Sequence, residues 1–282
     1  MYGAGDQEVK IMEEDWDNLI LLDACRYDDF KKENYIKGHL SSKISLGSAT
    51  PEFLNKNFEE STHHDTVYVT ANPMYRVEDL EGVFYHVIDV WESDWDDEKN
   101  TVPPEPMVEK TINAYQDFPD KRILAHFMQP HCPFIGEHSD EIGEHAGYER
   151  TYRQAKKKEG YQDDEKIWDL LEDGKVSVER ARNAYIGNLR LALENIEKLL
   201  DVFDEKTVIT SDHGNLFGEP VGVFGKSMYG HPTYTYSDEL RRVPWLVVSG
   251  DTRKTLQSKK PDTMAEDHEQ LVNERLSDLG YT

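Results

Sequence analysis

Short hydrophobic runs of strand character recur at wide intervals along the chain. They are rich in β-branched and aromatic residues and contain few polar positions, which is the pattern of strands buried on both faces of a sheet. They cover residues 18–24, 66–70, 83–90, 122–128, 207–211 and 243–248. The pattern therefore predicts buried strands that are far apart in the sequence.

Segments with helical periodicity lie between these runs. Residues 104–118 and 178–203 carry apolar side chains at spacings of three and four. Residues 51–58 begin with a proline directly after Thr50, and proline favours the first position of a helix. Strands separated by helices predict an α/β fold with a mainly parallel central sheet and helices on both faces. Such sheets bind ligands at the carboxyl ends of their strands.

Two segments depart from this alternation. Residues 137–173 are polar and lack a strand pattern, which predicts a helical insertion or lid within a single domain of residues 1–282. A solvated helical excursion is the favoured interpretation of this insertion, and an element that selects the substrate is the alternative. Residues 262–279 predict a short amphipathic helix or a frayed tail.

Composition narrows the classes of partner. The 282 residues include 56 Asp and Glu against 32 Lys and Arg, for a formal net charge of −24. This charge repels nucleic acid. It is best tolerated where high intracellular salt screens it, so we expect a halophilic protein, with an ordinary acidic cytosolic protein as the alternative.

Cysteine usage and hydropathy predict the compartment. Cys25 and Cys132 form neither a disulfide framework nor a C-x-x-C metal site. No apolar run approaches the length of a membrane span, so no stable membrane insertion is expected. These features predict a soluble, cytoplasmic protein.

Side chains that can bind metals follow the predicted strands. Asp23 ends the first run, His126 lies in the fourth, and Asp212 and His213 follow the fifth. By itself, the sequence from Asp212 to Gly214 also fits an Asx turn in which the glycine supplies a positive φ. Several such groups at strand ends point instead to a divalent cation. Carboxylates with imidazoles favour zinc or manganese, with magnesium or calcium as alternatives.

Four motifs in chain order resemble those of the alkaline phosphatase superfamily, and in particular its sulfatase-like branch. They are DACRYD, HFMQPHCPF, TSDHGNLFGE and GHPTYTYSDELRRVPWLVV, and they fall within about residues 15–250. The resemblance implies three ligands for the metal that holds the nucleophile: Asp23, Asp212 and His213. It also implies three histidines that contact a second metal, the transferred group or the leaving oxygen: His126, His131 and His231. Arg26 and Asp28 are expected to form a supporting ion pair.

The resemblance also implies a Thr, Ser or modified Cys nucleophile at the start of a helix, and GSATPEFL supplies two candidates. Thr50 is preferred because it directly precedes the proline-initiated helix, where free N–H groups stabilise an anion. Ser48 is the competitor, and a plain N-cap is the alternative role of Thr50. The arginine of the sulfatase signature C-x-P-x-R is absent. An unmodified hydroxyl favours phosphoryl transfer through a covalent intermediate.

The function expected from these residues is that of a metal-dependent hydrolase or transferase of phosphate mono- or diesters. His131 or His231 would protonate the leaving group. The substrate would be a small-molecule, glycan or lipid-type ester. A sulfuric ester hydrolase and a catalytically inactive binding member of the same fold are the alternatives.

The acidic excess predicts that salt stabilises the protein. The melting temperature should rise as salt increases from low to molar concentration, because screening weakens the repulsion among exposed carboxylates. Scanning calorimetry over this range of concentrations measures the effect. A flat or falling melting temperature would contradict halophilic behaviour.

Overall fold

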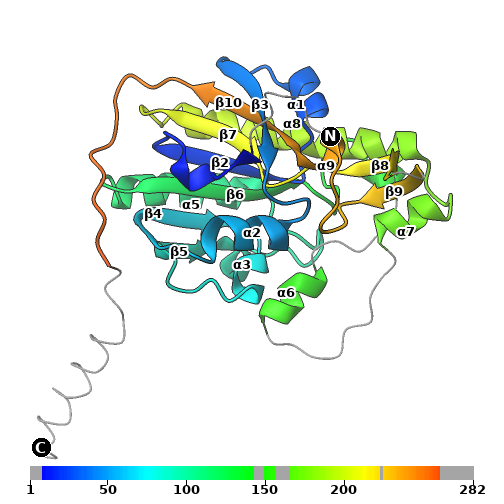
Figure 1. The fold of residues 1–282 in the computed structure, drawn as a ribbon, viewed down its shortest axis with the longest axis horizontal. Helices are drawn as coiled ribbons and strands as arrows, with labels where there is room; N and C mark the ends of the chain where they lie inside the picture. The colour runs from blue at the N-terminus through cyan, green and yellow to red at the C-terminus, as the bar shows by residue number, and fades with distance from the viewer. Residues whose placement is uncertain (1–7, 143–148, 157–165, 223–224, 261–282) are drawn as a thin grey trace, which may run out of the picture.

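An eight-stranded sheet lies at the centre of the computed structural model, which describes residues 8–142, 149–156, 166–222 and 225–260 (Figure 1). The strand order is β1-β3-β10-β7-β2-β6-β4-β5. Neighbouring strands are parallel except at β10, which runs antiparallel to both β3 and β7. The strands of this sheet are β1 (Glu8–Val9), β2 (Asn18–Asp23), β3 (His39–Ser45), β4 (His63–Thr70), β5 (Phe84–Asp89), β6 (Arg122–Pro130), β7 (Thr207–Ser211) and β10 (Arg242–Val248).

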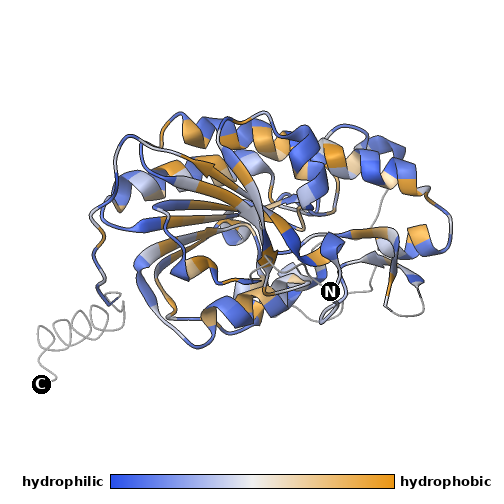
Figure 2. Ribbon diagram, turned by 45° about the horizontal axis from the view of Figure 1, so that its top comes forward, coloured by the Kyte–Doolittle hydropathy of each residue, from blue (hydrophilic) through white to orange (hydrophobic). Residues whose placement is uncertain are grey.

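Helices cover both faces of the sheet. Successive residues of a strand point to opposite faces, and β2 follows this rule. Its Ile20 and Leu22 belong to the apolar cluster that includes residues of α5 and α8, whereas Leu19 and Leu21 belong to the cluster that includes residues of α2 and α3. Figure 2 shows apolar residues gathered on the central strands and mixed polar and apolar residues on the helices. The larger helices are α1 (Tyr27–Glu33), α2 (Thr50–Phe58), α5 (Pro104–Asp117) and α8 (Val178–Leu200).

A smaller third cluster packs beside one end of the sheet. It joins α7 (Ile167–Glu172) and the first turns of α8 to the antiparallel hairpin of β8 (Leu216–Val221) and β9 (Lys226–Gly230). Its core includes the buried side chains of Ile167 and Phe217. The remaining short elements are η1 (Ile11–Glu13), α3 (Met74–Val77), α4 (Val90–Ser93), η2 (Ser139–Glu141), α6 (Glu149–Ala155) and α9 (Asp238–Arg241).

The mainly parallel α/β architecture expected from the sequence is confirmed. The predicted apolar runs coincide with β2, β4, β5, β6, β7 and β10. Strands β1 and β3 and the β8–β9 hairpin were not predicted. The sequence of β3, HLSSKIS, has two apolar residues, because β3 lies near the edge of the sheet and most of its side chains are only partly buried. Residues 262–279 lie outside the described residues.

The structure also bears on the polar segment and on membrane insertion. Within residues 137–173, the described part forms η2, α6 and α7. Ile167 and Leu171 are buried, so α7 is a packed element and not the solvated excursion that was favoured. Among the described residues, no helix is long and apolar enough to cross a membrane.

The loop that follows β6 is fastened to α8 by one buried amide. The Oδ1 atom of Asn188 accepts hydrogen bonds from the backbone N–H groups of Ile135 (2.7 Å) and Gly136 (2.9 Å). Its Nδ2 atom donates to the carbonyl oxygens of His131 (3.0 Å) and Pro133 (3.1 Å). Asn188 thus satisfies four backbone groups of a buried loop, which would otherwise lack partners.

We expect Asn188→Leu to lower the free energy of unfolding by about 2–4 kcal/mol, because each unsatisfied buried polar group costs about 1–3 kcal/mol and local rearrangement recovers part of the loss. Denaturant titration measures this change. Asn195→Leu is the matched control, since Asn195 is also buried on α8 but its Nδ2 donates within the helix to Leu191. Equal losses in the two variants would contradict a special role for Asn188.

Candidate metal centre and nucleophile

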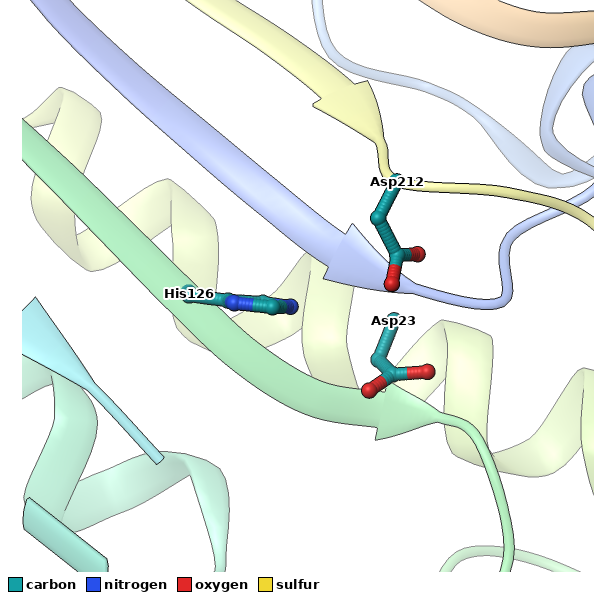
Figure 3. Close-up of side chains that lie close together, drawn as sticks. All are labelled: Asp23, His126 and Asp212. Atoms are coloured by element: carbon teal, nitrogen blue, oxygen red, sulfur yellow. The ribbon is translucent and has the colours of Figure 1, made fainter. Parts of the chain in front are cut away.

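Two carboxylates at the carboxyl ends of β2 and β7 converge with an imidazole from the neighbouring strand β6 (Figure 3). Asp23 is the last residue of β2, Asp212 directly follows β7, and His126 lies within β6. One ligand atom from each of the three lies within 4.8 Å of the other two. All three side chains are fully buried. Parallel pairing of β2 with both neighbours brings these residues together, although the sequence separates them widely.

The donor set fits a divalent cation. The fully buried carboxylate of Asp212 forms no ion pair with a lysine or arginine of the described residues, and burial raises its pKa. The Nε2 atom of His126 is buried and has no hydrogen-bond partner in the described part of the chain. Burying a carboxylate without a counter-charge is costly. Oxygen and imidazole ligands together suit zinc or manganese.

His213 directs an unprotonated ring nitrogen toward the carboxylates of Asp23 and Asp212. Its Nδ1 donates to the carbonyl oxygen of Gly214 (2.7 Å), so Nε2 carries the lone pair. Nε2 lies 3.4 Å from Oδ2 of Asp212 and 3.8 Å from Oδ1 of Asp23. Burial lowers the pKa of His213 to about 4, so the imidazole is neutral at pH 7, as metal binding requires.

Thr50 lies at the start of α2 with its hydroxyl directed at these ligands. Oγ1 donates to Oδ2 of Asp212 (2.8 Å) and lies 3.2 Å from Nε2 of His213. The N-cap of α2 is Ala49, and Thr50 is the first residue of the helix. The interpretation of Thr50 as a plain N-cap is therefore wrong, because Ala49 holds that position and the Thr50 hydroxyl contacts Asp212 and His213 in the loop after β7. Negative charge at Oγ1 would meet the positive end of the helix dipole.

Ser48 has a different environment. Its side chain is fully buried, and Oγ lies 2.9 Å from both Oε2 of Glu52 and the carbonyl oxygen of Pro232. Oγ also accepts a hydrogen bond from the backbone N–H of Thr235 (3.1 Å). These contacts fasten the loop after β9 to the start of α2.

His131 and His231 form a pair beside Thr50, and all three line a cavity of about 390 Å³. The Nε2 atoms of the two histidines are 2.9 Å apart. His131 Nδ1 donates to the carbonyl oxygen of Cys132, so the proton between the two rings belongs to His231. Burial lowers the pKa of His231 to about 3, which keeps its ring neutral at pH 7. The ring centroid of His231 lies 4.7 Å from that of His213.

Arg26 and Asp28 form an ion pair away from the cavity. Two guanidinium nitrogens of Arg26 each donate to an oxygen of Asp28 at 2.8 Å. Arg26 also pairs with Glu219 and donates to the carbonyl oxygen of Asn215 (3.2 Å). Because Asn215 follows His213 by two residues, Arg26 joins the turn after β2 to the loop that carries the candidate metal ligands.

Two supporting residues were missed by the sequence analysis. Nδ2 of Asn72 donates to Oδ2 of Asp23 (2.7 Å), and the hydroxyl of Tyr68 lies 2.7 Å from Nδ1 of His126. Both belong to β4 or the turn that follows it, two strands away from β2. Their sequence neighbourhood, YVTAN, holds no charged residue that would have indicated a site.

Gly214 is required because its backbone lies close to α9. Its φ is not positive, so the alternative of an Asx turn with a left-handed glycine does not hold. Its N–H donates to the carbonyl oxygen of Leu240 (2.6 Å), and a Cβ atom would lie 2.0 Å from the carbonyl oxygen of Glu239. The close approach of α9 therefore excludes any side chain here.

The sequence matches no protein-family model, and a search of curated proteins gives no match. Solved structures are similar. An integral membrane protein, lipooligosaccharide phosphoethanolamine transferase A from Neisseria meningitidis, aligns with 87% of this chain at 12% identity and a TM-score of 0.53. This chain covers 49% of that one.

Two periplasmic domains are also similar. The C-terminal domain of phosphoethanolamine transferase EptC from Campylobacter jejuni has 13% identity and a TM-score of 0.52, with 87% of this chain and 83% of that chain covered. The C-terminal domain of EptC from Escherichia coli, in complex with zinc, has 11% identity and a TM-score of 0.51, with 83% and 72% covered. With its sheet order and these likenesses, the chain has the α/β fold of the alkaline phosphatase superfamily.

Proposed function

We propose that the protein is a metal-dependent hydrolase or transferase of phosphate esters, with Thr50 as the nucleophile. One observation carries the proposal. The Thr50 hydroxyl lines a cavity, lies at a helix N-terminus and donates to the buried carboxylate of Asp212. Phosphoethanolamine transferases of the same fold support the choice of a phosphate ester.

The residues around Thr50 have separate roles in this proposal. Asp23, Asp212 and His213 would hold the divalent cation, with His126 as a further ligand. When bound, the cation supplies Lewis-acid stabilisation of negative charge on the hydroxyl and the ester oxygens. Oδ2 of Asp212 accepts the Thr50 proton in a hydrogen bond, which leaves the lone pairs of Oγ1 available to the substrate. The dipole of α2 stabilises the charge that develops on Oγ1.

The histidine pair would serve the leaving group. As the bond from Oγ1 to phosphorus forms, the Thr50 proton passes to Oδ2 of Asp212, the bond from phosphorus to the leaving oxygen breaks, and that oxygen needs a proton. We assign its delivery to His131 or His231, which line the same cavity as Thr50 and would first take up a proton from solvent, since the His231 ring is neutral at pH 7. Attack of water on the Thr50 phosphoester would give hydrolysis, and attack of an alcohol would give transfer.

Metal binding tests the first part of the proposal. Zinc titration followed by calorimetry should show a site in the wild type, and Asp212→Asn should weaken it by more than about tenfold. Without metal, Asp212→Asn should raise the melting temperature, because it removes a buried charge that lacks a counter-charge.

Asp238→Asn is the control for this experiment, since Asp238 is exposed on α9 and pairs with Arg242. It should leave zinc affinity unchanged. Equal zinc affinity in the wild type and Asp212→Asn would contradict the assignment.

Turnover tests the nucleophile. With zinc or manganese present, aryl phosphate, aryl phosphodiester and aryl sulfate are offered to the wild type, Thr50→Ala, Thr50→Ser and Ser48→Ala. Thr50→Ala should lose nearly all turnover and keep zinc affinity within a few-fold, whereas Thr50→Ser should retain some activity because it keeps a hydroxyl. Ser48→Ala should mainly lower the melting temperature, because it releases the hydrogen bonds to Glu52 and Pro232.

Mass spectrometry of acid-quenched enzyme should find the phosphoryl group on Thr50. Activity in Thr50→Ala together with an inactive Ser48→Ala would transfer the role to Ser48. Full activity in both would point to direct attack by water. If the wild type turned over none of the esters, the alternative of a catalytically inactive binding member of the same fold would be favoured.

A further inference from the structure

Among the described residues, the charged side chains that line the cavity beside Thr50 have a sign opposite to that of the net charge of the chain. Of the 282 residues 56 are acidic, and the net charge is −24. The described residues that line the cavity include no Asp or Glu, but they include Arg150 from α6 and Lys166 from the start of α7. A cationic wall in so acidic a protein indicates a ligand with negative charge on the side away from the candidate metal ligands.

Lys166 is held at a fixed place relative to the histidine pair. It is the N-cap of α7, whose next residue, Ile167, is fully buried. Trp168 packs on Gly230, where a Cβ atom would lie 3.0 Å from its Cδ1. The rings of Trp168 and His231 are 6.5 Å apart between centroids and nearly perpendicular. The backbone that carries Lys166 is therefore fixed against the residue that precedes His231.

The ammonium group of Lys166 forms no ion pair with a carboxylate of the described residues. The positive charge of Lys166 also acts on His231. Burial is the main cause of the lowered pKa of His231, and Lys166 lowers this pKa further.

We propose that Lys166 determines substrate specificity by binding a second anionic group of the substrate, distinct from the group that is transferred. The proposal rests on the function proposed above. A transferred phosphoryl group would lie against Thr50 and the histidines, and the cavity of about 390 Å³ falls within the range of about 300–1,000 Å³ for small-ligand sites. Trp168, Tyr229 and Met74 supply apolar wall for the carbon skeleton between the two groups. The substrate class is a small organic ester with two anionic groups, such as a sugar bisphosphate.

Binding of two sugars that differ by one phosphate tests this proposal. Fructose 1,6-bisphosphate and fructose 6-phosphate are titrated by calorimetry into Thr50→Ala protein, which prevents turnover, with and without zinc. Adding Lys166→Ala should weaken bisphosphate binding by about fivefold, the upper range for a partly exposed ion pair, and monophosphate binding by less than about twofold. Lys166→Arg should keep the preference for the bisphosphate, and Lys166→Glu should abolish it.

Lys175→Ala is the matched control, because Lys175 is an exposed lysine just after α7 and does not line the cavity. It should bind both sugars as the parent protein does. Equal weakening of the two sugars by Lys166→Ala would overturn the proposal, since Lys166 would then contact the transferred group. No weakening, or no binding of either sugar to the parent protein, would overturn it as well.

Failure of the proposed function gives a different result. Wild type that turns over none of the esters, while the bisphosphate preference still depends on Lys166, would reject catalysis and support the second anion site. If turnover depends on Thr50 but Lys166 has no effect on binding of the two sugars, catalysis would be supported and the second anion site rejected.

Discussion

Two carboxylates buried side by side set the main constraint on this structure. Asp23 and Asp212 are fully buried at the ends of adjacent parallel strands, where mutual repulsion and desolvation both oppose ionisation. The surrounding groups are arranged to receive negative charge. Backbone N–H groups of Ala24 and His213 donate to Asp212, and the side-chain amide of Asn72 donates to Asp23. Ala24 adopts a positive φ of 59° to turn the chain there, a strained conformation of the kind that concentrates at functional sites.

Helix α8 fixes the turn after β2 and the loop after β6 through buried hydrogen bonds. The hydroxyl of Tyr185 donates to the carbonyl oxygen of Ala24 and accepts the N–H of Arg26, both at 2.9 Å. One turn further along the helix, Asn188 fixes the loop after β6 that carries His131. A single helix therefore positions two of the loops that contribute to the site. Because both contacts are buried and polar, loss of either leaves groups without partners, so the geometry is strongly specified.

The polar segment after β6 contributes to the site through packing. Tyr152 of α6 stacks on Trp95 with centroids 4.2 Å apart and an interplanar angle of 7°, and it contacts Trp91 edge to face. These aromatic contacts hold α6 near α4, where Arg150 and Thr151 line the cavity. Helix α7 completes the wall from the other side through Trp168. The segment after β6 thus supplies cavity wall, whereas the candidate metal ligands come from β6 and from the ends of β2 and β7.

The sequence by itself determined the class of fold and identified the candidate metal ligands. Buried parallel strands need uninterrupted apolar runs, and several metal-capable side chains at the ends of such runs point to a shared cation, so Asp23 and Asp212 could be proposed from the sequence pattern. Tertiary structure alone decided between Thr50 and Ser48 as the hydroxyl that contacts Asp212, since the two residues lie only two positions apart at the start of the same helix. It also decided the places of Asn72, Asn188 and Lys166, which are ordinary polar residues in the sequence. Their roles arise from contacts with segments distant in the chain, and no local pattern of apolar and polar positions encodes such contacts.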